Sequence, residues 1–502
     1  MENQLEKRIS IGQRLMVGFP GYELDERFVR LVKEYKIGNV ILFRHNILNK
    51  YQLKRLCHDI QTLIQAETGY PAFIAIDQEG GVVTRLSSDT TNIAGAMAIA
   101  QTGDEENAYA LGYITGYELN AMGVNFNLAP DVDINSNPQN PVIGVRSFGE
   151  DSQTVIRYST KMIQGLHDGG VLTCAKHFPG HGDTNVDSHL DLPKIEKTLA
   201  ELESNELLPF YSAIKHGVDS ILIAHILFPN IEPTPVPATM SRKLVTDLLR
   251  HKIGFEGIIL TDCMEMNAIS KFFGTANGVK ASFCAGVDIA CISHYADLAE
   301  QAAILTFNAL ESGELNQSEH AQSVQRILQY KKEKLTSLSR NIELVGCEMN
   351  KAKNLDVIRK SILIKTPLAP LGSSPLFIGC TPFRATEASN KELDNFSFSE
   401  YLEKQKGGRS LQMSYDPKEP EINILVSQAA DASTVVIGTY QGHLHHGQLE
   451  VVNRVAALGI PTICVALRNP YDLDLLPNNI GKVCTYEYSE SSIRAVATLL
   501  KS

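Results

Sequence analysis

Tryptophan is absent from this chain of 502 residues, and the marks of several protein classes are missing too. No apolar stretch approaches the roughly 20 residues that cross a bilayer, so no membrane span is expected. The N-terminus has scattered charges and no apolar core of signal-peptide length. Lysine and arginine form no long run and the formal net charge is -11, so we expect no nucleic-acid partner.

The nine cysteines form no C-x-x-C pair and are dispersed along the chain. Cys174, Cys291 and Cys464 fall inside apolar runs, where a free cysteine behaves as a small hydrophobic residue. Disulfides are rare in reducing compartments, so the sequence predicts a cytoplasmic protein.

Short apolar runs alternate with helical patterns through the first two-thirds of the chain. The runs are continuous, as expected for parallel strands buried on both faces. This pattern predicts a (β/α)8 TIM-like barrel. A doubly wound open sheet is the alternative, although "GFPGYELDE" is a poor match to the phosphate loop of such a fold. The predicted strands are residues 15–19, 39–43, 72–76, 124–129, 171–175, 220–224, 257–261 and 287–291.

A second α/β pattern follows the predicted barrel. We expect a catalytic barrel over residues 1–335, a linker with a connecting helix over 336–372, and a smaller αβα sandwich domain over 373–502. The strands expected in the smaller domain are residues 375–380, 433–440, 461–467 and 482–488.

Ionisable side chains follow five successive predicted strands, at the ends where a barrel carries its active site. Neutral turn residues suffice to close a barrel rim, so this coincidence indicates function. The side chains are Asp77, Glu79 and Arg85, then Asp131 and Asp133, then the loop from Lys176 to His189, then His225 and Asp262.

The loop "KHFPGHGDTNVDSHLDLP" (176–193) holds the most concentrated chemistry. Asp187 and His189 are two residues apart and point the same way in an extended segment. A carboxylate orients an imidazole and favours its protonated form, which makes a proton shuttle near neutral pH. Together with the Asp262 carboxylate, such a donor makes up the pair that glycosidic bond cleavage requires.

Structural alternatives stay open for several of these residues. Asp133 is expected to be a turn residue, and His225 to close a strand end. Glu79 has two open roles, which are a functional one at the rim and the stabilisation of its own loop. A divalent metal is a further alternative, but no H-x-H pair follows a first strand. We therefore expect no metal and no cofactor. The residues considered for the metal are His177, His181, Asp183, Asp187 and His189.

The chain resembles the β-N-acetylglucosaminidases (β-hexosaminidases) of glycoside hydrolase family 3 in their two-domain form. The resemblance extends over nearly all of the predicted barrel, and the 176–189 motif is highly specific to this group. It rests on "DQEGG" (77–81), "GVNFNLAPDVDIN" (123–135), "VIGVRSFGED" (142–151), "KHFPGHGDTNVDSH" (176–189), "PATMS" (237–241) and "GFEGIILTDCMEM" (254–266).

The resemblance implies a retaining mechanism with a covalent glycosyl-enzyme intermediate. Asp262 matches the nucleophile, and His189 matches the acid/base, supported by Asp187. The positions that match those binding the terminal N-acetylglucosamine are Asp77, Arg85, Arg146, Lys176 and His177.

The expected activity is exo-acting release of N-acetylglucosamine from the non-reducing end of peptidoglycan fragments (muropeptides). The expected partner is this small carbohydrate. Alternatives are a phosphorylase with the same residues, a metal-dependent amidohydrolase, and a non-catalytic sugar-binding module. The aglycone, a homo-oligomeric state and the role of the loop with His443, His445 and His446 are left open.

Overall fold

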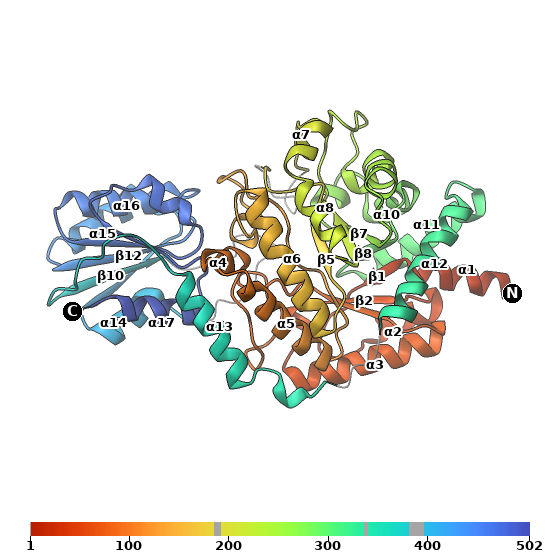
Figure 1. Cartoon of the computed structure of the whole chain (residues 1–502), viewed down its shortest axis with the longest axis horizontal. Helices are drawn as coiled ribbons and strands as arrows, with labels where there is room; N and C mark the ends of the chain where they lie inside the picture. Colours follow the sequence, from red (N-terminus) through yellow and green to blue (C-terminus); the bar gives the residue numbers. More distant parts are fainter. Residues whose placement is uncertain (1, 185–191, 336–339, 381–395, 502) are drawn as a thin grey trace.

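The protein is described here by a computed structural model that covers residues 2–184, 192–335, 340–380 and 396–501. Two sheets organise this part of the chain, one of eight strands and one of six. Figure 1 shows the second sheet beside α4 (Ala96–Gln101) and α6 (Ser152–Gly169), two helices on the outside of the first.

The eight-stranded sheet is a closed parallel barrel. Neighbouring strands pair in the order β4-β3-β2-β1-β8-β7-β6-β5. Parallel bridges between Phe126 and Leu172 and between Asp131 and Lys176 join β4 to β5 and complete the circle. The predicted barrel is confirmed, and the open-sheet alternative is wrong. The strands are β1 (Leu15–Val17), β2 (Asn39–Leu42), β3 (Phe73–Ile76), β4 (Phe126–Asn127), β5 (Cys174–Phe178), β6 (Ser220–Ile223), β7 (Ile258–Cys263) and β8 (Ile289–Ile292).

Most residues of the strands are apolar because both faces of the barrel sheet are buried. Inward side chains such as Met16, Phe73 and Phe126 fill the barrel, and outward ones pack against the surrounding helices. Ile327 of α12 (Gln317–Lys334) packs against the interior cluster, so this helix covers the amino end of the barrel. The candidate active site is therefore expected at the opposite, carboxyl end of the barrel.

Local sequence signals begin and end the helices. In α3 (Lys50–Thr68), Asn49 accepts hydrogen bonds from the amides of Tyr51 and Gln52, and Gly69 ends the helix with φ of 81°. The other helical segments of this part are α1 (Glu2–Gln13), α2 (Glu26–Tyr35), α3 (Lys50–Thr68), α5 (Glu106–Ala121), α7 (Leu199–Ser204), α8 (Leu208–Lys215), α9 (Asn267–Ser270), α10 (Thr275–Ala285) and α11 (Ala296–Ser312), with short or irregular turns η1 (Arg44–Asn46), η2 (Gly144–Arg146), η3 (Ala238–Met240) and η4 (Lys243–Lys252).

The second sheet has the strand order β11-β10-β12-β13-β14-β9 and is parallel except for β9. It confirms the predicted α/β fold. Its strands are β9 (Leu363–Thr366), β10 (Pro375–Cys380), β11 (Arg409–Met413), β12 (Thr434–Thr439), β13 (Thr462–Ala466) and β14 (Gly481–Cys484). Its helices and turns are α13 (Glu348–Ser361), α14 (Phe398–Lys406), α15 (Glu419–Ala429), α16 (His446–Ala457), α17 (Glu490–Leu499), η5 (Ile342–Leu344) and η6 (Pro470–Leu475).

Sequence analysis did not predict the two edge strands, β9 and β11. Both are only partly buried and carry polar residues, so neither forms an apolar run. β9 lies within the predicted linker, 336–372, yet pairs with β14. The predicted domain boundaries stay predictions.

Among the described helices, none has both the length and the apolar character that crossing a membrane requires.

Candidate active site

A cavity of about 320 Å³ opens at the carboxyl end of the barrel. It gathers six of the eight residues predicted for the site, although they come from different strands. The other two, Asp187 and His189, form the predicted dyad and lie outside the described residues. The six are Asp77, Arg85, Arg146, Lys176, His177 and Asp262.

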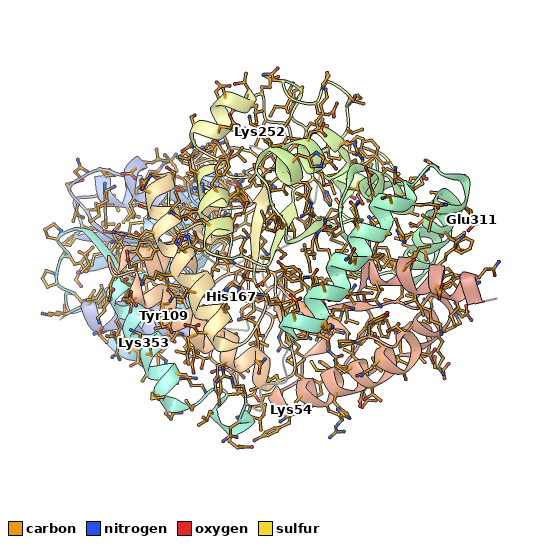
Figure 2. All side chains as sticks on the ribbon, turned by 45° about the vertical axis from the view of Figure 1, so that its right-hand side comes forward. Lys54, Tyr109, His167, Lys252, Glu311 and Lys353 are labelled. Atoms are coloured by element: carbon orange, nitrogen blue, oxygen red, sulfur yellow. The ribbon has the colours of Figure 1, made fainter. Side chains whose placement is uncertain are left out.

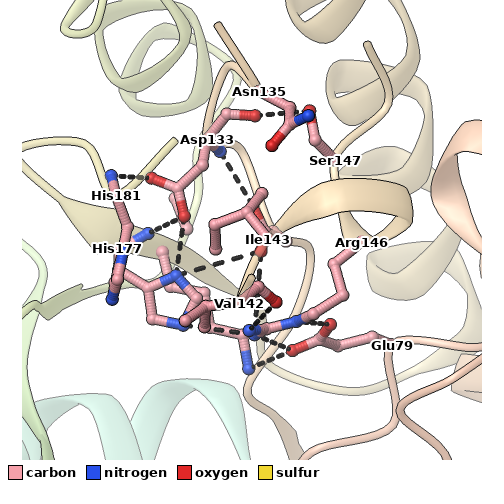
Figure 3. Close-up of polar contacts among 12 residues, drawn as sticks. Glu79, Asp133, Asn135, Val142, Ile143, Arg146, Ser147, His177 and His181 are labelled. Atoms are coloured by element: carbon pink, nitrogen blue, oxygen red, sulfur yellow. Dashed lines mark hydrogen bonds and ion pairs between the residues drawn. The ribbon is translucent and has the colours of Figure 1, made fainter. Parts of the chain in front are cut away.

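Glu79 is the centre of the charged network in this cavity. Its carboxylate accepts two hydrogen bonds from Arg146, at 2.8 and 2.9 Å, and forms an ion pair with Lys176 at 2.7 Å. Lys176 also donates to Asp77 at 2.8 Å. Figure 3 shows Glu79 and Arg146 directed toward each other. Glu79 therefore does more than stabilise its own loop. It holds the two cations that were predicted to bind a sugar.

The network keeps its members charged despite their burial. Burial opposes ionisation of Glu79, but the charges of Arg146 and Lys176 outweigh it and bring the pKa of the carboxyl well below its usual range. Burial likewise opposes the charge on Lys176, while Asp77 and Glu79 raise the pKa of its ammonium group. The cavity wall thus carries cationic and anionic side chains side by side, which can donate hydrogen bonds to hydroxyl groups and accept hydrogen bonds from them.

His177 is fixed by a carboxylate that sequence analysis expected in a turn. Asp133 Oδ2 accepts from His177 Nδ1 at 2.7 Å and from the His177 amide at 3.1 Å, and its Oδ1 accepts from the His181 amide at 2.6 Å. Asp133 does more than the expected turn residue would, because its buried carboxylate organises the loop after β5 (Figure 3).

The contacts of His177 select one neutral tautomer. Nδ1 carries the proton because it faces Asp133, which leaves Nε2 to accept from an Arg146 nitrogen 3.2 Å away. Burial and the nearby Arg146 charge lower the pKa of His177 to about 4. The ring is therefore neutral at physiological pH.

Asp131, Asp133 and His177 bring their ligand atoms within 4.8 Å of one another, which is a spacing that suits a metal ion. Burial and the neighbouring Asp133 raise the pKa of Asp131 to about 8, and burial raises that of Asp133 to about 6. Arg146 already supplies a positive charge 3.7 Å from Asp131 Oδ2. A second cation beside it would be repelled, so this set fits a metal poorly. Of the described residues that were considered for the metal alternative, which are His177, His181 and Asp183, His177 belongs to this set.

Asp262 lies at the end of β7 and lines the cavity. The amide of Cys263 donates to Asp262 Oδ1 at 2.7 Å. His225, at the end of β6, is 3.0 Å from the Cys263 carbonyl and 2.6 Å from Thr239 Oγ1. It thus ties two strand ends together, as its expected structural role requires.

Arg85 completes the described wall. It follows β3, is 8% exposed, and has its guanidinium 6.0 Å from the centre of the Phe43 ring. Its amide donates to Gln78 Oε1 at 2.8 Å, which fixes the turn around "DQEGG".

The comparisons with known proteins agree with the observed fold. Residues 6–330 match the family described as Glycosyl hydrolase family 3 N terminal domain. A "Beta-hexosaminidase A" of Pseudoalteromonas piscicida is 37% identical over 359 residues, which is 64% of this chain and 60% of that protein. The chain thus matches less than two thirds of that relative's length.

Two solved structures extend the likeness. A glycoside hydrolase family 3 β-N-acetylglucosaminidase from Paenibacillus sp. str. FPU-7 is 34% identical, with a TM-score of 0.90 over 98% of this chain and 96% of that one. NagZ from Neisseria gonorrhoeae, solved with N-trifluoroacetyl-D-glucosamine, is 30% identical with a TM-score of 0.58, over 68% of this chain and 96% of that one. The chain belongs to glycoside hydrolase family 3, in the group of its β-N-acetylglucosaminidases, or β-hexosaminidases.

Proposed function

We propose that this protein is a retaining exo-β-N-acetylglucosaminidase that releases terminal non-reducing N-acetylglucosamine from muropeptides or related β-linked amino sugars. Asp262 is the nucleophile and His189 the acid/base, with Asp187 supporting the imidazole. Membership of the family implies a substrate that contains N-acetylglucosamine.

The observation that carries the proposal is the Glu79-centred network beside Asp262 in one cavity. A volume of about 320 Å³ is at the lower end of small-molecule sites, roughly 300–1,000 Å³. Such a cavity suits one terminal sugar rather than a long glycan. Lys176 and Arg146 bring donors and Asp77 brings an acceptor, which together fix the sugar hydroxyls in one pose.

The proposed reaction has two steps. Asp262 attacks the anomeric carbon while the bond to the leaving oxygen breaks, and the protonated His189 gives its proton to that oxygen. A water then attacks the same carbon, the bond to Asp262 breaks, and the imidazole takes the proton of the water. The anomeric configuration is retained because the carbon is inverted twice.

Replacement of the nucleophile tests the first step. Asp262→Ala should reduce turnover of an aryl N-acetyl-β-glucosaminide by at least about 10³-fold, because no covalent intermediate can form. The exposed His216, replaced by alanine, serves as a control for handling and expression. An Asp262→Ala enzyme with the turnover of the wild type would end the proposal.

Trapping the intermediate tests the role of His189. In His189→Ala, an aryl substrate with an activated leaving group still reacts in the first step, but the second step lacks its base. Intact mass spectrometry should then show enzyme carrying one N-acetylglucosamine residue. Mass spectrometry of the digested enzyme should find this residue on the peptide that contains Asp262. Unmodified enzyme at steady state, with full turnover, contradicts the assignment.

Product analysis separates hydrolysis from phosphorolysis. The panel compares muropeptides, chitooligosaccharides and aryl glycosides, each with and without phosphate. Free N-acetylglucosamine as the main product in both conditions supports the hydrolase. Sugar 1-phosphate as the main product in phosphate assigns a phosphorylase with the same residues.

The proposal also places the protein in the cytoplasm. All nine cysteines are free thiols, and buried ones such as Cys174 and Cys464 pack as core residues. A core of this kind is typical of proteins from reducing compartments. Cell fractionation should find the activity with cytoplasmic markers, and activity outside the cytoplasm would contradict this part.

A further inference from the structure

The second sheet contacts the barrel beside the segment that carries Arg146. Tyr471, in the turn η6 after β13, and Tyr486, after β14, both cross from the second sheet to the barrel. Figure 1 shows the carboxyl side of this sheet next to the helices α4 and α6. The contact is therefore close to the sugar-binding wall, although no residue of the second sheet lines the described cavity.

The Tyr471 hydroxyl is bound by a residue of the barrel. It accepts a hydrogen bond from Asn135 Nδ2 at 2.6 Å. The ring is 9% exposed and lies edge-on to His443, with the ring centres 5.3 Å apart. Burial and the charge of the Glu150 carboxylate raise the pKa of Tyr471, so the hydroxyl stays neutral and keeps its bond to Asn135.

Asn135 links Tyr471 to the turn η2, which begins with Gly144. Asn135 Oδ1 accepts from the Gly144 amide at 3.0 Å, and the Asn135 amide donates to the Gly149 carbonyl at 3.0 Å. Asn135 thus joins the two ends of the segment that holds Arg146. Figure 3 shows Asn135 and Arg146 in the same group of polar contacts.

A side chain at position 144 would disturb this arrangement. Its φ of 48° is in the left-handed region, and a Cβ on it would lie 2.9 Å from Asn469 Oδ1 of the second sheet's loop. The turn η2 therefore packs directly against the second domain. Two residues later, Arg146 binds Glu79 and approaches His177.

We infer that Tyr471 is a positioning residue for the terminal sugar, because it holds Asn135, which holds the Gly144 amide and so sets the place of Arg146. The inference rests on the proposed function in one respect, the binding of the sugar by Arg146. It gives the second domain a part in substrate binding although none of its described side chains lines the cavity.

The test is Tyr471→Phe in the full-length chain, with an aryl N-acetyl-β-glucosaminide as substrate. Loss of the hydroxyl should raise KM about three- to tenfold and leave kcat within about twofold, because ground-state and transition-state binding weaken together. Tyr486→Phe is the matched control. Tyr486 is also buried, and its variant also loses one hydrogen bond between the domains, to Gln101 Oε1 at 2.9 Å. Its KM should not change.

A double variant tests the route through Asn135. Asn135→Ala alone should give a KM rise similar to that of Tyr471→Phe, and the two together should give no more than the larger single effect. Equal KM values for the two tyrosine variants overturn the inference, and so do additive effects in the double variant. If Tyr471→Phe does not yield folded protein, an unchanged KM in Asn135→Ala overturns it equally.

The outcomes separate this inference from the proposed function. No cleavage of any N-acetylglucosaminide by the wild type means that the proposed function is wrong. Cleavage by the wild type, with a raised KM in Arg146→Lys and an unchanged KM in Tyr471→Phe, contradicts the positioning role alone.

Discussion

Arg146 and Glu79 meet in a two-point ion pair, with nitrogen–oxygen distances of 2.8 and 2.9 Å. Only 3% and 6% of the two side chains are exposed, so water screens the pair little. Lys176 shares the same carboxylate. One anion therefore fixes both cations of the sugar-binding wall, and its removal should affect both.

Glu79→Gln should raise KM at least about tenfold and lower stability. Removing one partner of a buried ion pair costs about 3–5 kcal/mol, since the other charge stays buried without compensation. Steady-state kinetics and thermal unfolding measure the two effects. Glu118→Gln is the control. Glu118 is also a buried carboxylate and binds the amides of Thr91 and Gly346, away from the cavity. It should lower stability and leave KM unchanged. Equal KM values for the two variants would contradict the role of Glu79.

Asp133→Asn should lower kcat/KM by at least about tenfold, because an amide nitrogen cannot accept the Nδ1 proton and the neutral tautomer of His177 is no longer selected. Nitrogen-15 NMR of the imidazole should report the changed tautomer. Asp219→Asn is the matched control. Asp219 holds His167 at 2.6 Å and the Thr173 amide at 2.9 Å, on the amino side of the barrel. An Asp133→Asn enzyme with wild-type kinetics and an unchanged spectrum of His177 refutes this prediction.

His320 should make the protein less stable in acid. Its Nδ1 is 2.9 Å from an Arg14 nitrogen, and burial together with the Arg14 charge lowers the pKa of His320 to about 3. An unfolded histidine has a pKa of about 6.5, so between these values the unfolded chain binds the extra proton. The contribution of this group is therefore complete above pH of about 6.5 and is lost as the pH falls toward 3.

The measurement is the free energy of unfolding in urea at pH 7, 5.5 and 4. His320→Gln should show a shallower loss between pH 7 and 4 than the wild type does. The exposed His216, replaced by glutamine, should leave the slope unchanged. Equal slopes for the wild type and His320→Gln contradict the assignment.

Chelators should leave the activity unchanged. The Asp131, Asp133 and His177 group is the described set that could hold a metal ion, and Arg146 already neutralises part of its charge. Dialysis against EDTA followed by assay, with metal analysis of the purified protein, checks this. A stoichiometric metal whose removal abolishes activity and whose return restores it supports the amidohydrolase alternative instead.

The sequence could predict those features that short segments of chain determine. All eight barrel strands were predicted from apolar runs, and each run overlaps an observed strand. Asp77, Lys176 and Asp262 each follow directly after a predicted strand, so the barrel fold alone was enough to place them on one rim. Glu79 was accessible to the same reasoning, since it is two residues from Asp77 and points to the same side in an extended segment.

Only the tertiary structure decided which partners these side chains take. Asp133 and His177 are 44 residues apart, and Asn135 and Tyr471 are 336 residues apart. Nothing in the local pattern marks either pair, because hydrogen-bond partners are chosen by position in space. The edge strands β9 and β11 were missed for a related reason. Their backbone pairs with neighbours distant in sequence, while their side chains are too exposed to form an apolar run. The sequence by itself determined the barrel and the chemical groups on its rim. The packing of distant segments determined which carboxylate holds which cation, because burial makes those pairings strong.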